Sequence, residues 1–119
     1  MSRAQGLSVL LLAAIAVLLS AWYLWLLPPT VLPPGLVLGA MLVPALPGLA
    51  LGVFGRRSAA FWAGVASLLY FSHGVMEAWT TPGALWLGLA EAGLACAVVV
   101  AAAWDAIAAR YRRRSAGGV

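Results

Sequence analysis

Residues 7–27 read LSVLLLAAIAVLLSAWYLWLL, an apolar run that contains no charged side chain. About 20 apolar residues are enough for one helix to cross a bilayer. Because Arg3 precedes this run, a signal peptide is the alternative interpretation. The run is longer than the apolar core of a typical signal peptide, and no clear small-residue cleavage site follows it. We therefore expect a retained transmembrane helix over residues 7–27.

Three further apolar runs follow, at residues 35–54, 59–79 and about 84–109. An open sheet cannot satisfy its backbone groups in lipid, and runs of this length are wrong for a barrel. The sequence predicts an all-α membrane protein with four antiparallel transmembrane helices, short loops and one domain over residues 1–119. A proline-rich linker covers residues 28–34, and Pro44 and Pro47 predict a kink in the second helix.

Composition supports a membrane location, since 65% of the 119 residues are hydrophobic, 8% are charged and the mean hydropathy is +1.03. A soluble domain is about a quarter charged, so soluble enzymes, nucleic-acid binders and disordered chains are excluded. The lipid bilayer is the partner that this composition implies. Cys96 is the single cysteine, so no disulfide forms within the chain, and we expect Cys96 to be an ordinary buried residue.

The cations indicate an orientation. Four crossings place both termini and the middle loop on one side, and all seven arginines fall on that side: Arg3, Arg56, Arg57, Arg110, Arg112, Arg113 and Arg114. The positive-inside rule assigns this side, with the N- and C-termini, to the cytoplasm. Aromatic residues agree, because Trp22, Tyr23, Trp25, Trp79 and Trp86 gather at the predicted outer interface.

Four residues inside the predicted helices can readily change charge near neutral pH: His73, Glu77, Glu91 and Asp105. Folding the third and fourth helices about residues 81–82 places Glu91 level with His73, and Asp105 near Arg57. His73 and Glu77 are four residues apart and share a helix face. We predict a candidate polar site of His73, Glu77 and Glu91 in the outer leaflet, with Tyr70 beneath it. Asp105 is expected to form a structural ion pair with Arg57 or Arg110.

The polar site has several interpretations. Its side chains can hold helices together, bind a partner or ligand, or carry a proton or cation, since an imidazole beside a carboxylate can take up a proton. One histidine and two carboxylates do not match the facial triad of non-haem iron sites. No metal and no other cofactor is expected.

Residues 69–79, LYFSHGVMEAW, closely resemble the third-helix signature of a family of small bacterial membrane proteins, the domain of unknown function 2069. The similarity extends to WLLPP at 25–29, PALPGL at 44–49 and WLGLAE at 86–91. The resemblance implies a multi-pass protein of the proteobacterial inner membrane and supplies no reaction. Members commonly carry a basic residue beside the tryptophan of the outer turn, and residues 81–85 have none here.

Three functions fit these observations. The first is a non-enzymatic protein that binds or scaffolds another membrane component, either a membrane-protein partner or further copies in a homo-oligomer. The second is a proton- or cation-coupled transporter that acts as an oligomer. Small multidrug transporters share the size and helix number, but their essential carboxylate lies in the first helix, which is uncharged here. The third, an enzyme with His73 as base, lacks a nucleophile beside the histidine other than Ser72.

Overall fold

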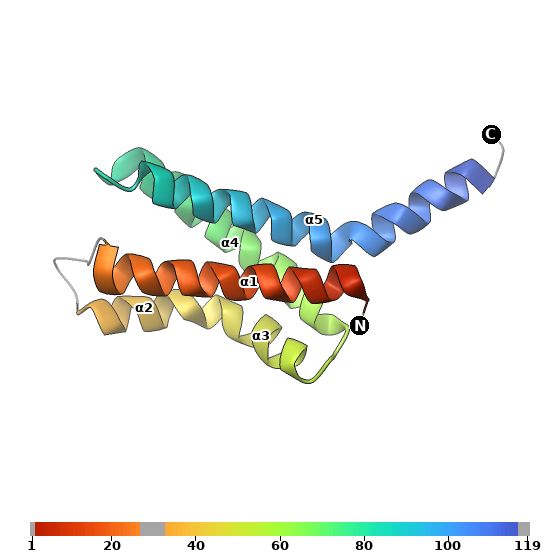
Figure 1. Cartoon of the computed structure of the whole chain (residues 1–119), viewed down its shortest axis with the longest axis horizontal. Helices are drawn as coiled ribbons and strands as arrows, with labels where there is room; N and C mark the ends of the chain where they lie inside the picture. The colour runs from red at the N-terminus through yellow and green to blue at the C-terminus, as the bar shows by residue number, and fades with distance from the viewer. Residues whose placement is uncertain (1, 27–32, 117–119) are drawn as a thin grey trace.

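The computed structural model describes residues 2–26 and 33–116, and the elements in these ranges are helical (Figure 1). They are α1 (Arg3–Ala21), a π-helical segment (Trp22–Leu26), α2 (Pro34–Leu42), a 3-10 turn (Val43–Ala45), α3 (Leu46–Val53), α4 (Ser58–Thr80) and α5 (Leu85–Ala116). In this part of the chain, four helical spans are long and apolar enough to cross a membrane. The predicted all-α membrane fold is confirmed.

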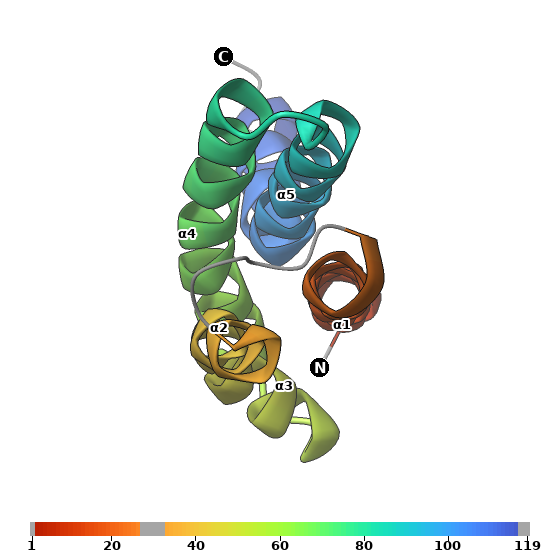
Figure 2. The ribbon, with the colours of Figure 1, turned by 90° about the vertical axis from the view of Figure 1, so that its left-hand side faces the viewer.

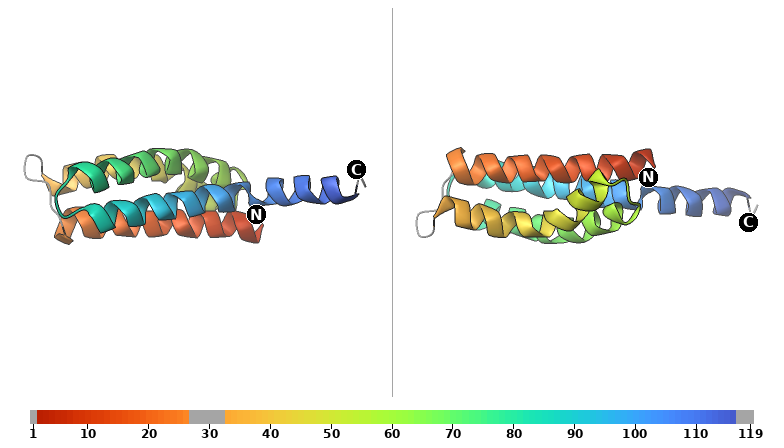
Figure 3. Two further views of the ribbon diagram at one scale, coloured as in Figure 1. Left: turned by 90° about the horizontal axis from the view of Figure 1, so that it is seen from above. Right: turned by 90° about the horizontal axis from the view of Figure 1, so that it is seen from below.

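The helices form an elongated antiparallel bundle (Figures 2 and 3). α5 packs most extensively on α4 and next on α1, whereas α3 packs on α4. The start of α1, the end of α5 and the α3–α4 connection lie toward one end of the bundle, and the end of the π-helical segment, the start of α2 and the α4–α5 connection lie toward the other (Figure 3). All seven arginines belong to segments at the first of these ends.

The second span bends where its prolines predict a kink. Pro44 lies in the 3-10 turn between α2 and α3, and Pro47 lies in the first turn of α3. Proline lacks a backbone donor and clashes with the preceding helical turn, so the regular bonding pattern is interrupted here. Past the bend, a Cβ on Gly48 would lie 2.9 Å from Leu12 and 3.1 Å from the Ala63 nitrogen, so α3 packs tightly on α1 and α4. Of the predicted linker at 28–34, residues 28–32 lie outside the described ranges.

Two predicted helix boundaries differ from the structure by several residues. α1 begins at Arg3 rather than at residue 7, because Ser2 and Gln5 form a capping box that satisfies backbone donors of the first turn. α5 continues to Ala116 rather than ending near 109. Its 32 residues span about 48 Å, against about 30 Å of hydrocarbon. The C-terminal part of α5, with its arginines, therefore projects beyond the bundle (Figure 1).

The core consists of large apolar residues of α1 set against small residues of α4 and α5. Its fully buried members include Leu12, Ile15, Leu19, Ala63, Ala66, Ala95 and Val98. Cys96 is exposed on the outer side of α5, so its predicted burial is wrong. It is four residues from the buried Ala92 but falls outside the stripe that packs on α4 and α1.

α4 and α5 approach each other closely at a pair of glycines. A Cβ on Gly74 would lie 2.6 Å from the carbonyl oxygen of Gly88 and 3.0 Å from the Ala92 nitrogen. A Cβ on Gly88 would likewise overlap the Gly74 carbonyl oxygen and the Ala78 nitrogen. Small residues allow backbones to meet in this way in membrane helices. The contact lies next to His73 and Glu91, and therefore sets how far apart their side chains are.

Candidate functional site

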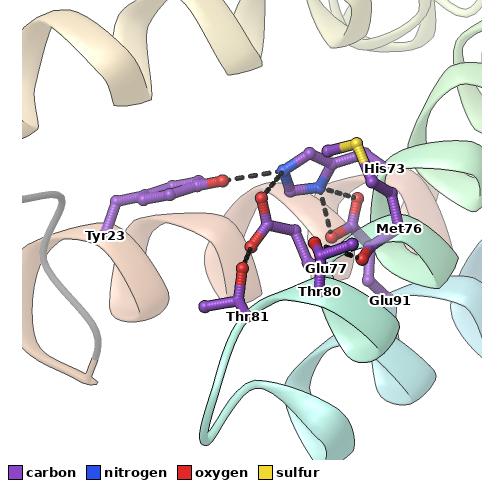
Figure 4. Close-up of polar contacts among 7 residues, drawn as sticks. All are labelled: Tyr23, His73, Met76, Glu77, Thr80, Thr81 and Glu91. Atoms are coloured by element: carbon purple, nitrogen blue, oxygen red, sulfur yellow. Dashed lines mark hydrogen bonds and ion pairs between the residues drawn. The ribbon is translucent and has the colours of Figure 1, made fainter.

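His73 is the centre of a polar cluster that joins three helices near the α4–α5 turn (Figure 4). Its Nδ1 atom lies 2.9 Å and 3.0 Å from the two carboxyl oxygens of Glu91 on α5. Its Nε2 atom lies 2.7 Å from the hydroxyl of Tyr23, in the π-helical segment after α1. Both ring nitrogens of this histidine therefore have a partner.

Glu91 is fully buried, with 0% of its side chain exposed, and the side chain of His73 is 12% exposed. The sequence-based prediction that these two residues lie level on adjacent helices is confirmed by the contact between them. An unpartnered polar group in the hydrocarbon region costs several kcal/mol. The carboxyl group of Glu91 avoids this cost because the imidazole bonds to both of its oxygens.

Glu77 lies on the other side of the imidazole, one helical turn after His73. One of its carboxyl oxygens is 3.8 Å from His73 Nε2, and the other accepts a hydrogen bond from the hydroxyl of Thr81. The side chain of Glu77 is 20% exposed, the highest value among the two carboxylates and the histidine. The cluster thus runs from the buried Glu91 to the partly exposed Glu77 at the end of α4.

Tyr23 and Thr81 are cluster members that sequence reasoning missed. Tyr23 was expected in the aromatic belt at the outer interface, but it is only 8% exposed, and Trp22 is 1% exposed. Trp22 stacks on Tyr23 at a ring-centroid distance of 5.6 Å and lies equally close to His73. The sequence signal that could have identified Tyr23 is its position along the bundle, since it lies at the end of the first span, at about the level of Glu77. Trp25, Trp79 and Trp86, by contrast, are exposed.

Tyr70 lies apart from the cluster, one helical turn deeper than His73. Its hydroxyl donates a hydrogen bond to the carbonyl oxygen of Met41 at 2.8 Å, and its side chain is 1% exposed. Met41 precedes the proline-containing turn, where the regular helical pattern ends. Tyr70 therefore joins α4 to α2, and the structure gives it no hydrogen bond to His73, Glu77 or Glu91 among the described residues.

The predicted ion pair of Asp105 is wrong. Asp105 accepts a hydrogen bond from the hydroxyl of Ser2 at the start of α1. Within residues 2–26 and 33–116, neither Arg57 nor Arg110 lies within 4.0 Å of this carboxylate, and the ion pairs found are those of His73. Ser2 also caps α1, so this contact joins the start of that helix to α5.

The geometry defines what the cluster can do chemically. Histidine presents opposite nitrogens to the two carboxylates, so one ion cannot contact all three side chains through the same imidazole nitrogen. In the described part of the chain, no three His, Cys, Asp or Glu residues are arranged to hold a metal ion. The arrangement is instead suited to sharing a proton. When Glu91 is ionised, Nδ1–H donates to its carboxylate and the Tyr23 hydroxyl donates to Nε2. When Glu91 is protonated, its O–H donates to Nδ1, and Nε2–H donates to the hydroxyl oxygen of Tyr23.

Comparison with known proteins assigns the family. No curated protein and no solved structure matches the chain. A family model described as "Predicted membrane protein (DUF2069)" matches residues 7–113, which contain all four membrane-length spans except for the start of the first and the end of the fourth. His73, Glu77 and Glu91 all fall within the matched region. The chain belongs to the DUF2069 family of predicted membrane proteins.

Proposed function

We propose that the protein is a non-enzymatic component of the bacterial inner membrane that binds or scaffolds another membrane protein or a second copy of itself. In this proposal both termini face the cytoplasm, as the positive-inside rule expects for the arginine-bearing end. The His73 cluster fixes the positions of α1, α4 and α5, and the outer faces of the bundle provide the binding surface. Nucleic acid has no part in this function.

The observation that carries the proposal is a helix-packing face on α2 that no described residue covers. Gly35 and Gly39 lie four residues apart on one side of α2, and within residues 2–26 and 33–116 a Cβ on either would have no neighbour within 4 Å. Two other pairs in the described part of the chain are occupied, since Gly74 and Gly88 join α4 to α5, and Gly48 and Gly52 of α3 face Leu12, Ala63 and Val9. Glycines at this spacing let a second transmembrane helix approach closely.

The closed form of the polar cluster supports the same function. Glu91 has 0% exposure, and both ring nitrogens of His73 are engaged by side chains of the chain itself. A substrate would have to displace one of these bonds to reach the imidazole. Hydrogen bonds between membrane helices contribute about 0.6 kcal/mol on average, enough to fix helix register without any further task.

Comparative affinity purification in mild detergent tests the proposal. The tagged full-length chain, Gly39→Leu and Gly93→Leu are purified, and co-purifying membrane proteins and differently tagged second copies are quantified by mass spectrometry. Gly93 is the matched control because it also has nothing within 4 Å, but lies on α5. We expect one species to be enriched with the parent chain and Gly93→Leu and lost with Gly39→Leu. Equal recovery from all three forms, or the bait alone, would contradict the proposal.

A proton-coupled transporter that acts as an oligomer is the second candidate. It is favoured by the chain of hydrogen bonds from Tyr23 through His73 to Glu91, which can carry its protons in two arrangements. Proton flux into proteoliposomes, measured with a pH-sensitive dye, tests this candidate. Loss of flux in Glu91→Gln and Glu77→Gln, with flux retained in Asp105→Asn, supports transport. No flux in the parent chain eliminates it.

A further inference from the structure

A groove runs along the outside of the bundle between α1 and α5, at the end that carries the arginines. It has a volume of about 710 Å³ and is lined from α1 by residues such as Leu7 and Leu11, and from α5 by Ala97, Val100 and Ala101. From Asp105 at one end to Cys96 at the other it covers ten residues of α5, a rise of about 14 Å. This length matches the hydrocarbon depth of one leaflet, about half of 30 Å.

One arginine lines this groove, and a second, Arg112, lies about 10 Å past its Asp105 end along α5. Arg3, the first residue of α1, is part of its lining. Arg112 lies eleven residues after Ala101, which is about 20° around the helix at 100° per residue, so it continues the same side of α5. Its Nε donates a hydrogen bond to the carbonyl oxygen of Ala108 at 3.4 Å, so the side chain runs back along α5 in the direction of the groove.

The charged side chains at this end of the bundle are predominantly positive. All seven arginines of the chain belong to segments at this end, and Asp105 is the one acidic side chain beside them, because Glu77 lies near the end of α4 and Glu91 near the start of α5. Asp105 lines the groove, and its carboxylate accepts a hydrogen bond from Ser2. An apolar channel with excess positive charge at its mouth is complementary to a lipid with an anionic headgroup.

We propose that this groove is a binding site for an anionic phospholipid. One acyl chain lies between α1 and α5, and Arg3 and Arg112 bind the phosphate-bearing headgroup through charge-assisted hydrogen bonds. Trp104 also lines the groove, next to Asp105, and its ring is of the amphipathic kind that is enriched at the level of lipid headgroups. This site is separate from the α2 face and does not depend on the function proposed above.

The test uses the purified, delipidated full-length chain in detergent, titrated with phosphatidylglycerol or with phosphatidylcholine that has the same acyl chains. Bound lipid is counted by native mass spectrometry, and the thermal unfolding midpoint is recorded. We expect phosphatidylglycerol to bind at least about fivefold more tightly, since each arginine near a headgroup contributes about that factor. Arg3→Gln and Arg112→Gln should each weaken phosphatidylglycerol binding about fivefold and leave phosphatidylcholine unchanged.

Arg110→Gln is the matched charge control, because Arg110 lies about 180° around the helix from Ala101 and points away from the groove. Ala97→Phe tests the acyl-chain channel, with Leu89→Phe, an exposed position outside the groove, as its control. Loss of binding in Ala97→Phe but not in Leu89→Phe supports the site. Equal affinity for the two lipids, or equal weakening by Arg110→Gln and Arg112→Gln, would overturn it, because either result describes unspecific attraction to a basic surface.

Discussion

The Nδ1 atom of His73 on α4 lies 2.9 Å from a carboxyl oxygen of Glu91 on α5, and 0% of the Glu91 side chain is exposed. This contact connects two helices that also meet at Gly74 and Gly88. Replacing Glu91 with Ala leaves Nδ1 without its partner and opens a cavity at a closely packed interface. We expect the free energy of unfolding to fall by about 1–3 kcal/mol.

Thermal unfolding in detergent measures this effect. Glu91→Gln keeps the shape and one hydrogen bond, so it should lose less stability than Glu91→Ala. If Glu91→Ala were as stable as the parent chain, the contact between Glu91 and His73 would not contribute to the stability of the bundle.

Tyr23 bonds to the same imidazole from α1, with its hydroxyl 2.7 Å from Nε2. Tyr23→Phe removes this hydrogen bond and preserves the ring that stacks on Trp22. We expect a loss of about 0.6 kcal/mol, the average for hydrogen bonds between membrane helices. A double-mutant cycle with His73→Gln should give a coupling of similar size. Tyr111→Phe, at a position that is 74% exposed, is the control and should change nothing.

The approach of α4 to α5 depends on two glycines. A Cβ on Gly88 would overlap the backbone of Gly74 and Ala78, which cannot move aside as a flexible side chain would. We expect Gly88→Ala to destabilise the bundle by about 1–3 kcal/mol, the usual cost of overpacking. Gly93→Ala on the same helix has open space around it and should be neutral or stabilising by up to about 1 kcal/mol. Equal unfolding midpoints for the two variants would contradict the close approach.

Ser2 has two roles at the start of α1, since it caps the helix and donates a hydrogen bond to Asp105. Ser2→Ala should lower stability by about 0.5–2 kcal/mol through the lost cap. Arg57→Gln and Arg110→Gln should each change stability by less than about 0.5 kcal/mol, because neither arginine pairs with Asp105 in the described residues. A large loss of stability in either arginine variant would contradict the structure and would support the ion pair with Asp105 that the sequence predicted. Chemical denaturation in detergent micelles gives all three values.

Depth along the membrane could be predicted from the sequence, but rotation about the helix axis could be predicted only in part. The lengths of the apolar runs and the turn at residues 80–83 place His73 level with Glu91, and the structure confirms their contact. The aromatic pattern predicted Tyr23 in the belt at the outer interface, whereas the structure buries its side chain against His73. Trp22 and Tyr23 lie in the π-helical segment, and both side chains are buried in the bundle. No local sequence pattern predicts a π-helical segment at this position.

The sequence by itself determined that the chain is a helical membrane protein, because four long apolar runs cannot be buried in any other way. It also determined the kink at Pro44 and the charge asymmetry, since both follow from the covalent structure and the order of residues. Tertiary structure decided which polar groups meet. Tyr70 bonds to Met41 rather than to His73, and Asp105 bonds to Ser2 rather than to an arginine. These hydrogen-bond partners depend on how closely the helices approach one another. That distance is set by contacts of small residues such as Gly74, and these contacts form only when the bundle assembles.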